Sequence, residues 1–430
     1  MKKLLAATLA AIFVLALLAG CGKRSENTEN EKKTESLWGK SITYVKVELP
    51  DKALETESSV ARAISPDGKR LFISAPYTGA PYLWDIDEEK KISVSLGNDM
   101  TAEVLRFMFW NTARMNFKTG DSFERFQEDF ADVDTLKGDK LLERIFNSGN
   151  VPFFTCAVTT VPAKDNVMIV TDSGYTAYFA MDVDTGALYA VPEGILMGVV
   201  DGTMYSLSKP SSVIKYEMAT GKELGKVDFS FAMNNGIISN AFVMADGTIC
   251  AVVYGVSEDL KTGVDCALGV IRPDGSRETY ALGKRSMSQL PALLFAADSR
   301  YFVLQNSVSN DIATFVDTET GEVSLLLPNG SSVEKAALDS RLNEDGAVNT
   351  IPDDSRYFRY FTGMADGETI FCSDADYAPS LFRPSTGEVK RLLYSVVMPV
   401  FNSYSGNGYD RWLFFDPIDY KNVWIRFDVK

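Results

Sequence analysis

The 430-residue sequence contains no histidine. Without imidazole the chain can form neither a Ser-His-Asp triad nor a Cys-His pair, and it offers no histidine ligand to zinc or haem. It also lacks a phosphate-binding G-x-x-x-x-G-K-[ST] loop, an Asp-x-Asp-x-Asp-Gly calcium loop and a Cys-x-x-Cys pair. Carboxylate, lysine or tyrosine chemistry stays open, and we expect no cofactor and no metal site.

The chain is also short of positive charge. It has 43 Lys and Arg residues against 58 Asp and Glu, a formal net charge of −15. A nucleic-acid partner would need a basic face over its phosphates, so we expect none. With 46% hydrophobic and 23% charged residues the composition is that of a globular protein, which excludes wholesale disorder.

No hydrophobic run is long enough to span a bilayer. Lys2 and Lys3 precede an apolar run from Leu4 to Ala19, which is 16 residues where a spanning helix needs about 20. A basic start, a short apolar run and small residues before a cut are typical of a secretory signal.

The end of this run, Leu18-Ala19-Gly20-Cys21, resembles the bacterial lipobox. The resemblance implies that residues 1–20 are a lipoprotein signal peptide and that Cys21 becomes a diacylated N-terminus, with acyl chains such as palmitate. Two chains are enough for stable anchoring. We therefore expect a cell-membrane, lipid-anchored protein on the extracytoplasmic side. The alternative is an ordinary secreted protein with a chance cysteine. Residues 21–40 are polar and are predicted to be a flexible tether.

A loosely repeated phrase follows, in which an apolar strand leads through an Asp/Thr/Gly turn into another strand. It occurs at 181–188, 216–224, 316–323 and 382–389, and a second turn phrase is Ser65-Pro66-Asp67-Gly68. Pro presets φ and Gly accepts positive φ in such turns. These phrases resemble the WD40-like propeller repeats of TolB-type bacterial proteins. The resemblance implies an all-β β-propeller over 41–430 with about seven four-stranded blades, in units 61–95, 152–190, 195–228, 238–281, 292–326, 345–391 and 395–429.

Two segments fall outside the repeat. The strand predicted at 41–49 should join the last blade and close the ring. Residues 99–148 form a predicted helical insertion after the first blade, because positions 104, 105, 108 and 109, and then 141, 142, 145 and 146, are apolar at helical spacing. Its apolar face either packs on the propeller or serves as a docking arm or lid.

The remaining cysteines, Cys156, Cys250, Cys266 and Cys372, fit free, buried residues. Cys250 and Cys266 are the one pair placed to share a hairpin, where a disulfide is the alternative. The carboxylate pairs Asp182/Asp184, Asp353/Asp354 and Asp374/Asp376 are interpreted as turn residues that accept hydrogen bonds from backbone amides. The aromatic clusters Tyr77/Tyr82/Trp84 and 403–412 are interpreted as blade packing rather than ligand platforms.

Two functions remain. We favour a membrane-anchored module whose propeller binds a protein or glycan partner, with Cys21 as the lipidation site and no catalytic residue. The alternative is a carboxylate-dependent hydrolase or lyase acting on cell-surface carbohydrate, since a pair of carboxylates cleaves a glycosidic bond without histidine. The ligand-binding residues are not identified by the sequence.

Overall fold

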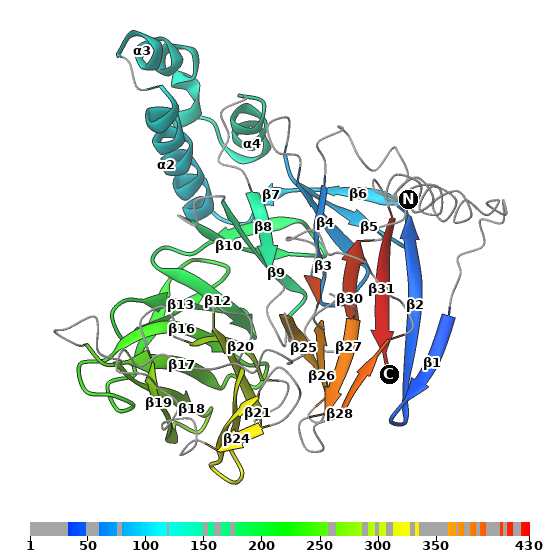
Figure 1. The fold of residues 1–430 in the computed structure, drawn as a ribbon. Helices are drawn as coiled ribbons and strands as arrows, with labels where there is room; N and C mark the ends of the chain where they lie inside the picture. The colour runs from blue at the N-terminus through cyan, green and yellow to red at the C-terminus, as the bar shows by residue number, and fades with distance from the viewer. Residues whose placement is uncertain are drawn as a thin grey trace, which may run out of the picture.

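The computed structural model describes residues 33–48, 60–74, 80–117, 120–148, 154–158, 165–172, 177–256, 264–285, 291–296, 301–306, 313–326, 332–334, 360–366, 369–373, 379–383, 388–392, 405–406, 411–415 and 423–430. Within these ranges the chain is an all-β propeller with one helical arm (Figure 1).

The strands pair into seven sheets, of which four have four strands and three have five. The sequence had predicted four strands in each blade. We letter the sheets A to G in the order in which they follow one another around the ring. Sheet A joins both ends of the chain: β1 (Lys33–Leu37), β2 (Lys40–Glu48), β31 (Val423–Val429), β30 (Arg411–Phe415) and β29 (Ser405–Gly406).

Sheets B to D come next. Sheet B contains β3 (Val60–Ile64), β4 (Arg70–Ser74), β5 (Tyr82–Asp85) and β6 (Lys90–Ser93). Sheet C contains β7 (Ser95–Leu96), β11 (Ala187–Ala190), β10 (Tyr178–Asp182), β9 (Val167–Asp172) and β8 (Phe154–Val158). Sheet D contains β12 (Ile195–Val200), β13 (Thr203–Ser208), β14 (Ser212–Glu217) and β15 (Glu223–Asp228).

Sheets E to G complete the ring. Sheet E contains β16 (Ile237–Val243), β17 (Ile249–Tyr254), β18 (Val264–Ile271) and β19 (Arg277–Arg285). Sheet F contains β20 (Pro291–Ala296), β21 (Tyr301–Asn306), β22 (Ala313–Asp317), β23 (Val323–Leu326) and β24 (Ser332–Glu334). Sheet G contains β25 (Tyr360–Asp366), β26 (Thr369–Ser373), β27 (Pro379–Arg383) and β28 (Glu388–Arg391).

Each sheet contacts the next, and sheet A contacts sheet B through β29 and β3, so the ring is closed. β2 pairs antiparallel with β31 from Ile42 opposite Val429 to Glu48 opposite Val423. The prediction that the strand near 41–49 joins the last blade is therefore confirmed. The tether predicted to reach residue 40 is too long, because β1 begins at Lys33 and pairs with β2.

The recurrent phrase is explained by one tight turn. In the first copy Gly186 donates its N–H to Asp182 O at 2.8 Å, and in the third copy Gly321 donates to Asp317 O at the same distance. Both glycines have positive φ, +73° and +72°, which only glycine adopts at low cost. The second copy closes in the same way, with Gly221 donating to Glu217 O at 2.8 Å, so the glycine is the residue that the turn requires.

The helical insertion is confirmed, with one change at its start. It consists of α2 (Asp99–Asn116), α3 (Gly120–Asp129), η2 (Ala131–Asp134) and α4 (Gly138–Phe146). It does not leave directly from the first blade: β7 intervenes and pairs in parallel with β11 of sheet C. A two-residue strand carries no periodicity, so the sequence gives no sign of it. We call α2, α3, η2 and α4 the arm.

Candidate interaction surface

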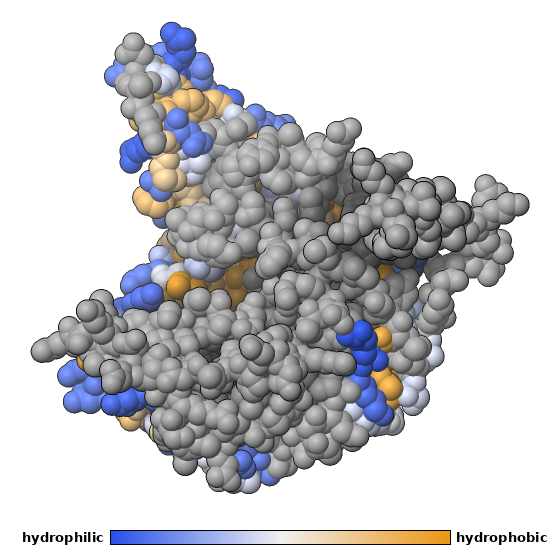
Figure 2. Space-filling view, in the orientation of Figure 1, coloured by the Kyte–Doolittle hydropathy of each residue, from blue (hydrophilic) through white to orange (hydrophobic). Residues whose placement is uncertain are grey.

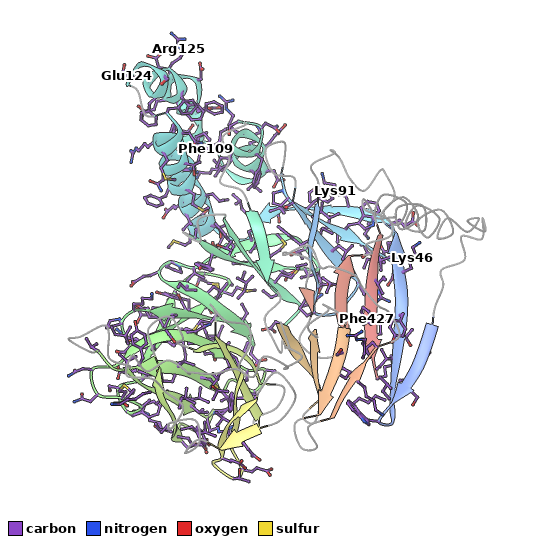
Figure 3. All side chains as sticks on the ribbon, in the orientation of Figure 1. Lys46, Lys91, Phe109, Glu124, Arg125 and Phe427 are labelled. Atoms are coloured by element: carbon purple, nitrogen blue, oxygen red, sulfur yellow. The ribbon has the colours of Figure 1, made fainter. Side chains whose placement is uncertain are left out.

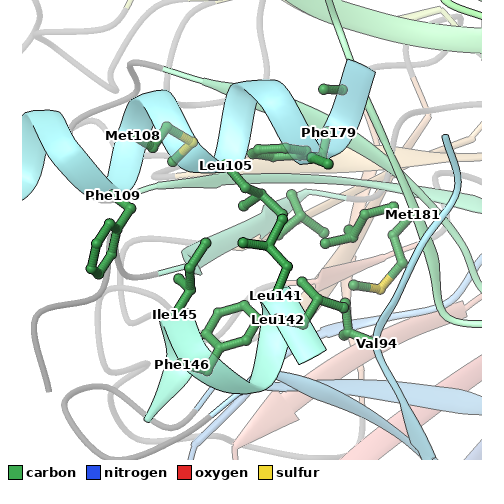
Figure 4. Packing of buried hydrophobic residues seen from close by; sticks show 14 of the residues in the cluster. Val94, Leu105, Met108, Phe109, Leu141, Leu142, Ile145, Phe146, Phe179 and Met181 are labelled. Atoms are coloured by element: carbon green, nitrogen blue, oxygen red, sulfur yellow. The ribbon is translucent and has the colours of Figure 1, made fainter. Parts of the chain in front are cut away.

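The inner face of the arm is part of the protein's core. Leu105, Met108 and Phe109 of α2 are at most 3% exposed. They belong to one hydrophobic cluster with α4 and with side chains of the propeller, among them Val94, between β6 and β7, and Phe179 and Met181 of β10 (Figure 4). The interpretation that the apolar face of the insertion packs on the propeller is therefore confirmed for this face. Val104, which the spacing had also assigned to this face, is half-buried and packs against the same cluster.

Polar contacts fix the base of the arm to sheet C. The Asn98 side chain caps α2 by accepting the Thr101 N–H at 2.9 Å. The Thr101 hydroxyl, which is fully buried, accepts the Ala190 N–H at 2.9 Å and lies 3.0 Å from Leu188 O as a donor. Both Ala190 and Leu188 belong to β11, so the first turn of α2 is hydrogen-bonded directly to a strand of sheet C.

The same asparagine reaches the neighbouring sheet. Its amide nitrogen donates to Met218 O at 3.2 Å and to Ala219 O at 3.3 Å, in the turn after β14. Asn98 and Thr101 together therefore tie the base of the arm to sheets D and C.

The outer half of the arm is held by its own contacts. The Arg106 guanidinium donates to Val133 O at 3.1 Å and to Leu136 O at 2.6 Å. Arg144 pairs with Asp132 at 3.0 Å. Phe126 stacks on Phe130 with ring centroids 4.5 Å apart. The arm is thus a packed unit, and Glu124 and Arg125 mark its tip (Figure 3).

The outer face of α2 is different. Phe107 is 70% exposed and Met115 is 56% exposed. Met100 is half-buried, two turns before Phe107. We call Met100, Phe107 and Met115 the apolar row. In Figure 2 hydrophobic colour runs along the α2 side of the arm, whereas the α3 tip is mostly hydrophilic. A helix that buries one apolar face and exposes another is typical of an interaction surface.

The carboxylate pair Asp182/Asp184 divides into two roles. Asp182 accepts the Thr185 N–H and hydroxyl, both at 2.9 Å, as its interpretation as a turn residue requires. Asp184 does not serve the turn. It accepts from Arg70 Nη1 of sheet B at 3.0 Å and from Asn166 Nδ2 at 3.1 Å. The pair is therefore engaged in holding structure, and Asp184 joins two blades.

A second polar cluster lies on sheet E. Arg272 donates to Glu278 at 2.9 Å, and this hydrogen bond lowers the pKa of Glu278. The Tyr280 hydroxyl donates to the same carboxylate at 2.8 Å. Burial, followed by the hydrogen bond to Glu278, raises the pKa of Tyr280 to about 12. Tyr280 also lies 3.5 Å from Thr318 O of sheet F, so this cluster too connects neighbouring blades.

Cys250 and Cys266 lie on adjacent strands but form no disulfide. In the pairing of β17 with β18, Cys250 is opposite Val270 and Cys266 is opposite Tyr254. The two cysteines are therefore four residues apart along the strands. Both thiols are buried and outside any disulfide, as interpreted, and burial raises the pKa of the Cys250 thiol.

The other predicted residues are placed as follows. Tyr82 and Trp84 are at most 5% exposed, which confirms blade packing for these two. Cys21, Tyr77, Asp353/Asp354 and Asp374/Asp376 lie outside the described residues, as does most of 403–412. In the part of the chain that the structure describes, no three acidic or cysteine side chains form a group that could hold a metal. None of the helices described combines the length and hydropathy needed for a membrane span.

Comparisons with known proteins bear on the fold alone. No family model and no curated protein matches the chain. Among solved structures, the complex of KlAtg21 with the coiled-coil of AgAtg16 is similar at a TM-score of 0.46 and 10% identity, covering 83% of this chain and 91% of that chain. U3-55K is similar at a TM-score of 0.43 and 10% identity, covering 89% of this chain and 98% of that chain. The RRP9 WD40 repeats are similar at a TM-score of 0.43 and 9% identity, covering 93% of this chain and 100% of that chain. At these identities no role transfers to this chain.

Proposed function

We propose that the chain is a lipid-anchored, extracytoplasmic propeller of seven blades that binds a protein partner through its arm. The observation that carries this proposal is the exposure of Phe107, 70%, on a helix whose other face is fixed in the core. Covering a phenylalanine side chain is worth about 1.5–3 kcal/mol relative to leaving it in water. Because the helix is already ordered, a partner gains this energy without the entropic cost of folding the site.

The location rests on the lipobox at Cys21. The described part of the chain begins at Lys33, twelve residues after that cysteine. Twelve extended residues span at most about 40 Å. The lipid would therefore keep the ring close to the bilayer, and the partner would be an envelope or membrane-associated protein. The anchored chain would lack Lys2 and Lys3 and have 41 Lys and Arg against 58 Asp and Glu, a net charge of −17. It would have no attraction of its own to an anionic leaflet, so the acyl chains must supply the anchoring.

Anchoring and binding are tested separately. Cys21→Ser should move the protein from the membrane fraction to the soluble fraction and remove acyl chains from its mass. If Cys21→Ser protein stays in the membrane fraction, the anchoring half of the proposal is wrong.

Binding is tested with Phe107→Ser in the full, lipidated chain, by cross-linking in intact cells. The variant should lose the cross-linked partner that the wild type retains, with an unchanged unfolding transition because Phe107 lies outside the core. Val256→Ser is the matched control, since Val256 is 68% exposed but lies after β17, away from the arm. Loss of the partner in both variants, or in neither, would contradict binding through the arm.

A further inference from the structure

We infer that the partner of the arm is a second copy of this chain, and that two α2 helices pair antiparallel through their outer faces. This inference rests on the proposed function of the arm and names its occupant. It comes from the order in which charge and apolar surface follow one another along α2.

Glu103, Phe107 and Arg114 lie on one stripe of the helix. At about 100° per residue, Glu103 and Arg114 lie within about 40° of Phe107 around the helix axis. All three side chains are exposed. The acidic residue is one turn before the phenylalanine and the basic residue is two turns after it. The outer face therefore runs from negative through apolar to positive.

Both charges are available to a partner. Within the described residues neither Glu103 nor Arg114 has an ion-pair partner. The other arginine of α2, Arg106, is occupied by its hydrogen bonds to Val133 and Leu136. Arg114 is thus the arginine of α2 that a second molecule can reach.

A twofold axis through the midpoint of Glu103 and Arg114 makes this face complementary to itself. Each Glu103 then lies opposite Arg114 of the other copy, and the contact occurs twice. Phe107 is one and a half residues from that midpoint, so the two phenylalanines are about 4.5 Å apart along the axis and lie side by side. The antiparallel helix dipoles add to the attraction.

Charge favours this occupant over a bilayer. The tip of the arm carries exposed Glu124, Glu128 and Asp129 against a single Arg125, so an anionic membrane surface would repel it. A helix-to-helix contact is smaller than the roughly 1,200 Å² of a standard stable interface, which makes the pair a weak one. Confinement of both copies to one membrane raises their effective concentration and compensates for this.

Charge reversal in the full chain tests the pairing. The association of wild type, Glu103→Arg, Arg114→Glu and the double variant is measured on lipid vesicles by energy transfer between fluorescently labelled copies, over a range of protein-to-lipid ratios. Each single reversal should raise the dimer dissociation constant by about tenfold or more, because two attractive contacts become repulsive. The double variant restores both contacts with the signs exchanged and should return to within about threefold of wild type. Glu124→Arg is the matched control and should leave the constant unchanged.

A second measurement fixes the geometry. Phe107→Cys on vesicles should form a disulfide-linked dimer under mild oxidation. Met115→Cys should not, because the two copies of that position would be about 20 Å apart along the axis. Formation of both disulfides, or only of the second, would contradict the register.

The outcomes separate this inference from the proposed function. A wild type that stays monomeric at every concentration, or a double variant no better than the single ones, overturns the pairing of two copies. If Phe107→Ser still abolishes cross-linking to a different protein in that case, the arm is a binding surface with another occupant. If neither association depends on Phe107, both proposals are wrong.

Discussion

Replacement of Thr101 by valine should loosen the attachment of the arm, and the structure gives the size of the effect. The Thr101 hydroxyl has one proton, which it shares between Asn98 Oδ1 at 2.8 Å and Leu188 O at 3.0 Å. Its oxygen accepts the Ala190 N–H. Valine keeps the shape of the side chain and removes both functions.

Most of the cost comes from the amide of Ala190. Leu188 O keeps a second hydrogen bond, from Gly97 N at 2.8 Å, and Asn98 keeps the Thr101 N–H. Ala190 is fully buried, so its N–H would be left without an acceptor. An unsatisfied buried donor costs about 1–3 kcal/mol. Thr101→Ser, which keeps the hydroxyl and loses one methyl group, should cost about 0.8 kcal/mol.

Urea unfolding of the two variants gives the free energies, and amide hydrogen exchange locates the change. The Ala190 amide should exchange faster in the valine variant and at the wild-type rate in the serine variant. The reasoning is refuted if valine is no less stable than serine, or if exchange at Ala190 is unchanged.

Three further predictions concern the ring. In urea unfolding, Arg70→Met should lower the free energy of unfolding more than Asp184→Asn, because Arg70 also pairs with the nearly buried Asp85. Asp184 is 61% exposed, and its pair with Arg70 is worth at most about 1 kcal/mol. Equal losses of stability would contradict this. The pKa of Tyr280 is about 12, above the unfolded value of 10. The protonated hydroxyl therefore stabilises the folded state fully below pH 10, and this stabilisation is lost as the pH rises toward 12. The loss should be absent in Tyr280→Phe. Gly186→Ala should destabilise more than Gly275→Ala, because a Cβ at Gly186 would lie 2.5 Å from Ser93 O whereas Gly275 faces open space; thermal unfolding compares the two.

The sequence predicts those parts of the fold whose interactions lie within a few consecutive residues. The turn at 182–186 is closed by a hydrogen bond within five residues and ends on a glycine of positive φ, so a short segment of sequence is enough to predict it. The four apolar positions 141, 142, 145 and 146 of α4 are all at most 5% exposed, as their helical spacing requires.

Contacts between distant segments could not be predicted in this way. Arg70 and Asp184 are 114 positions apart, and nothing near Asp184 distinguishes an aspartate that pairs with another blade from one that serves its own turn. The polar composition of β1 predicted a tether because a strand at the outer edge of a sheet buries little, and its pairing with β2 depends mainly on backbone groups.

The sequence of α2 indicates an exposed apolar outer face, but the helical spacing of apolar residues alone does not show it. Residues 107–110, Phe-Met-Phe-Trp, are four consecutive apolar residues. On a helix they point in directions that together cover about 300° of its circumference, so one neighbouring layer cannot bury them all. In the structure Met108 is buried in the core cluster, Phe109 packs against Phe126 and Phe130 of the arm, and the Trp110 indole donates to Asp134. Phe107 alone of these four is left in solvent. When the outer face of α2 is rotated by 180°, its Glu103 and Arg114 meet residues of opposite charge on the unrotated face. We therefore assign a second copy of the chain as the partner that covers Phe107.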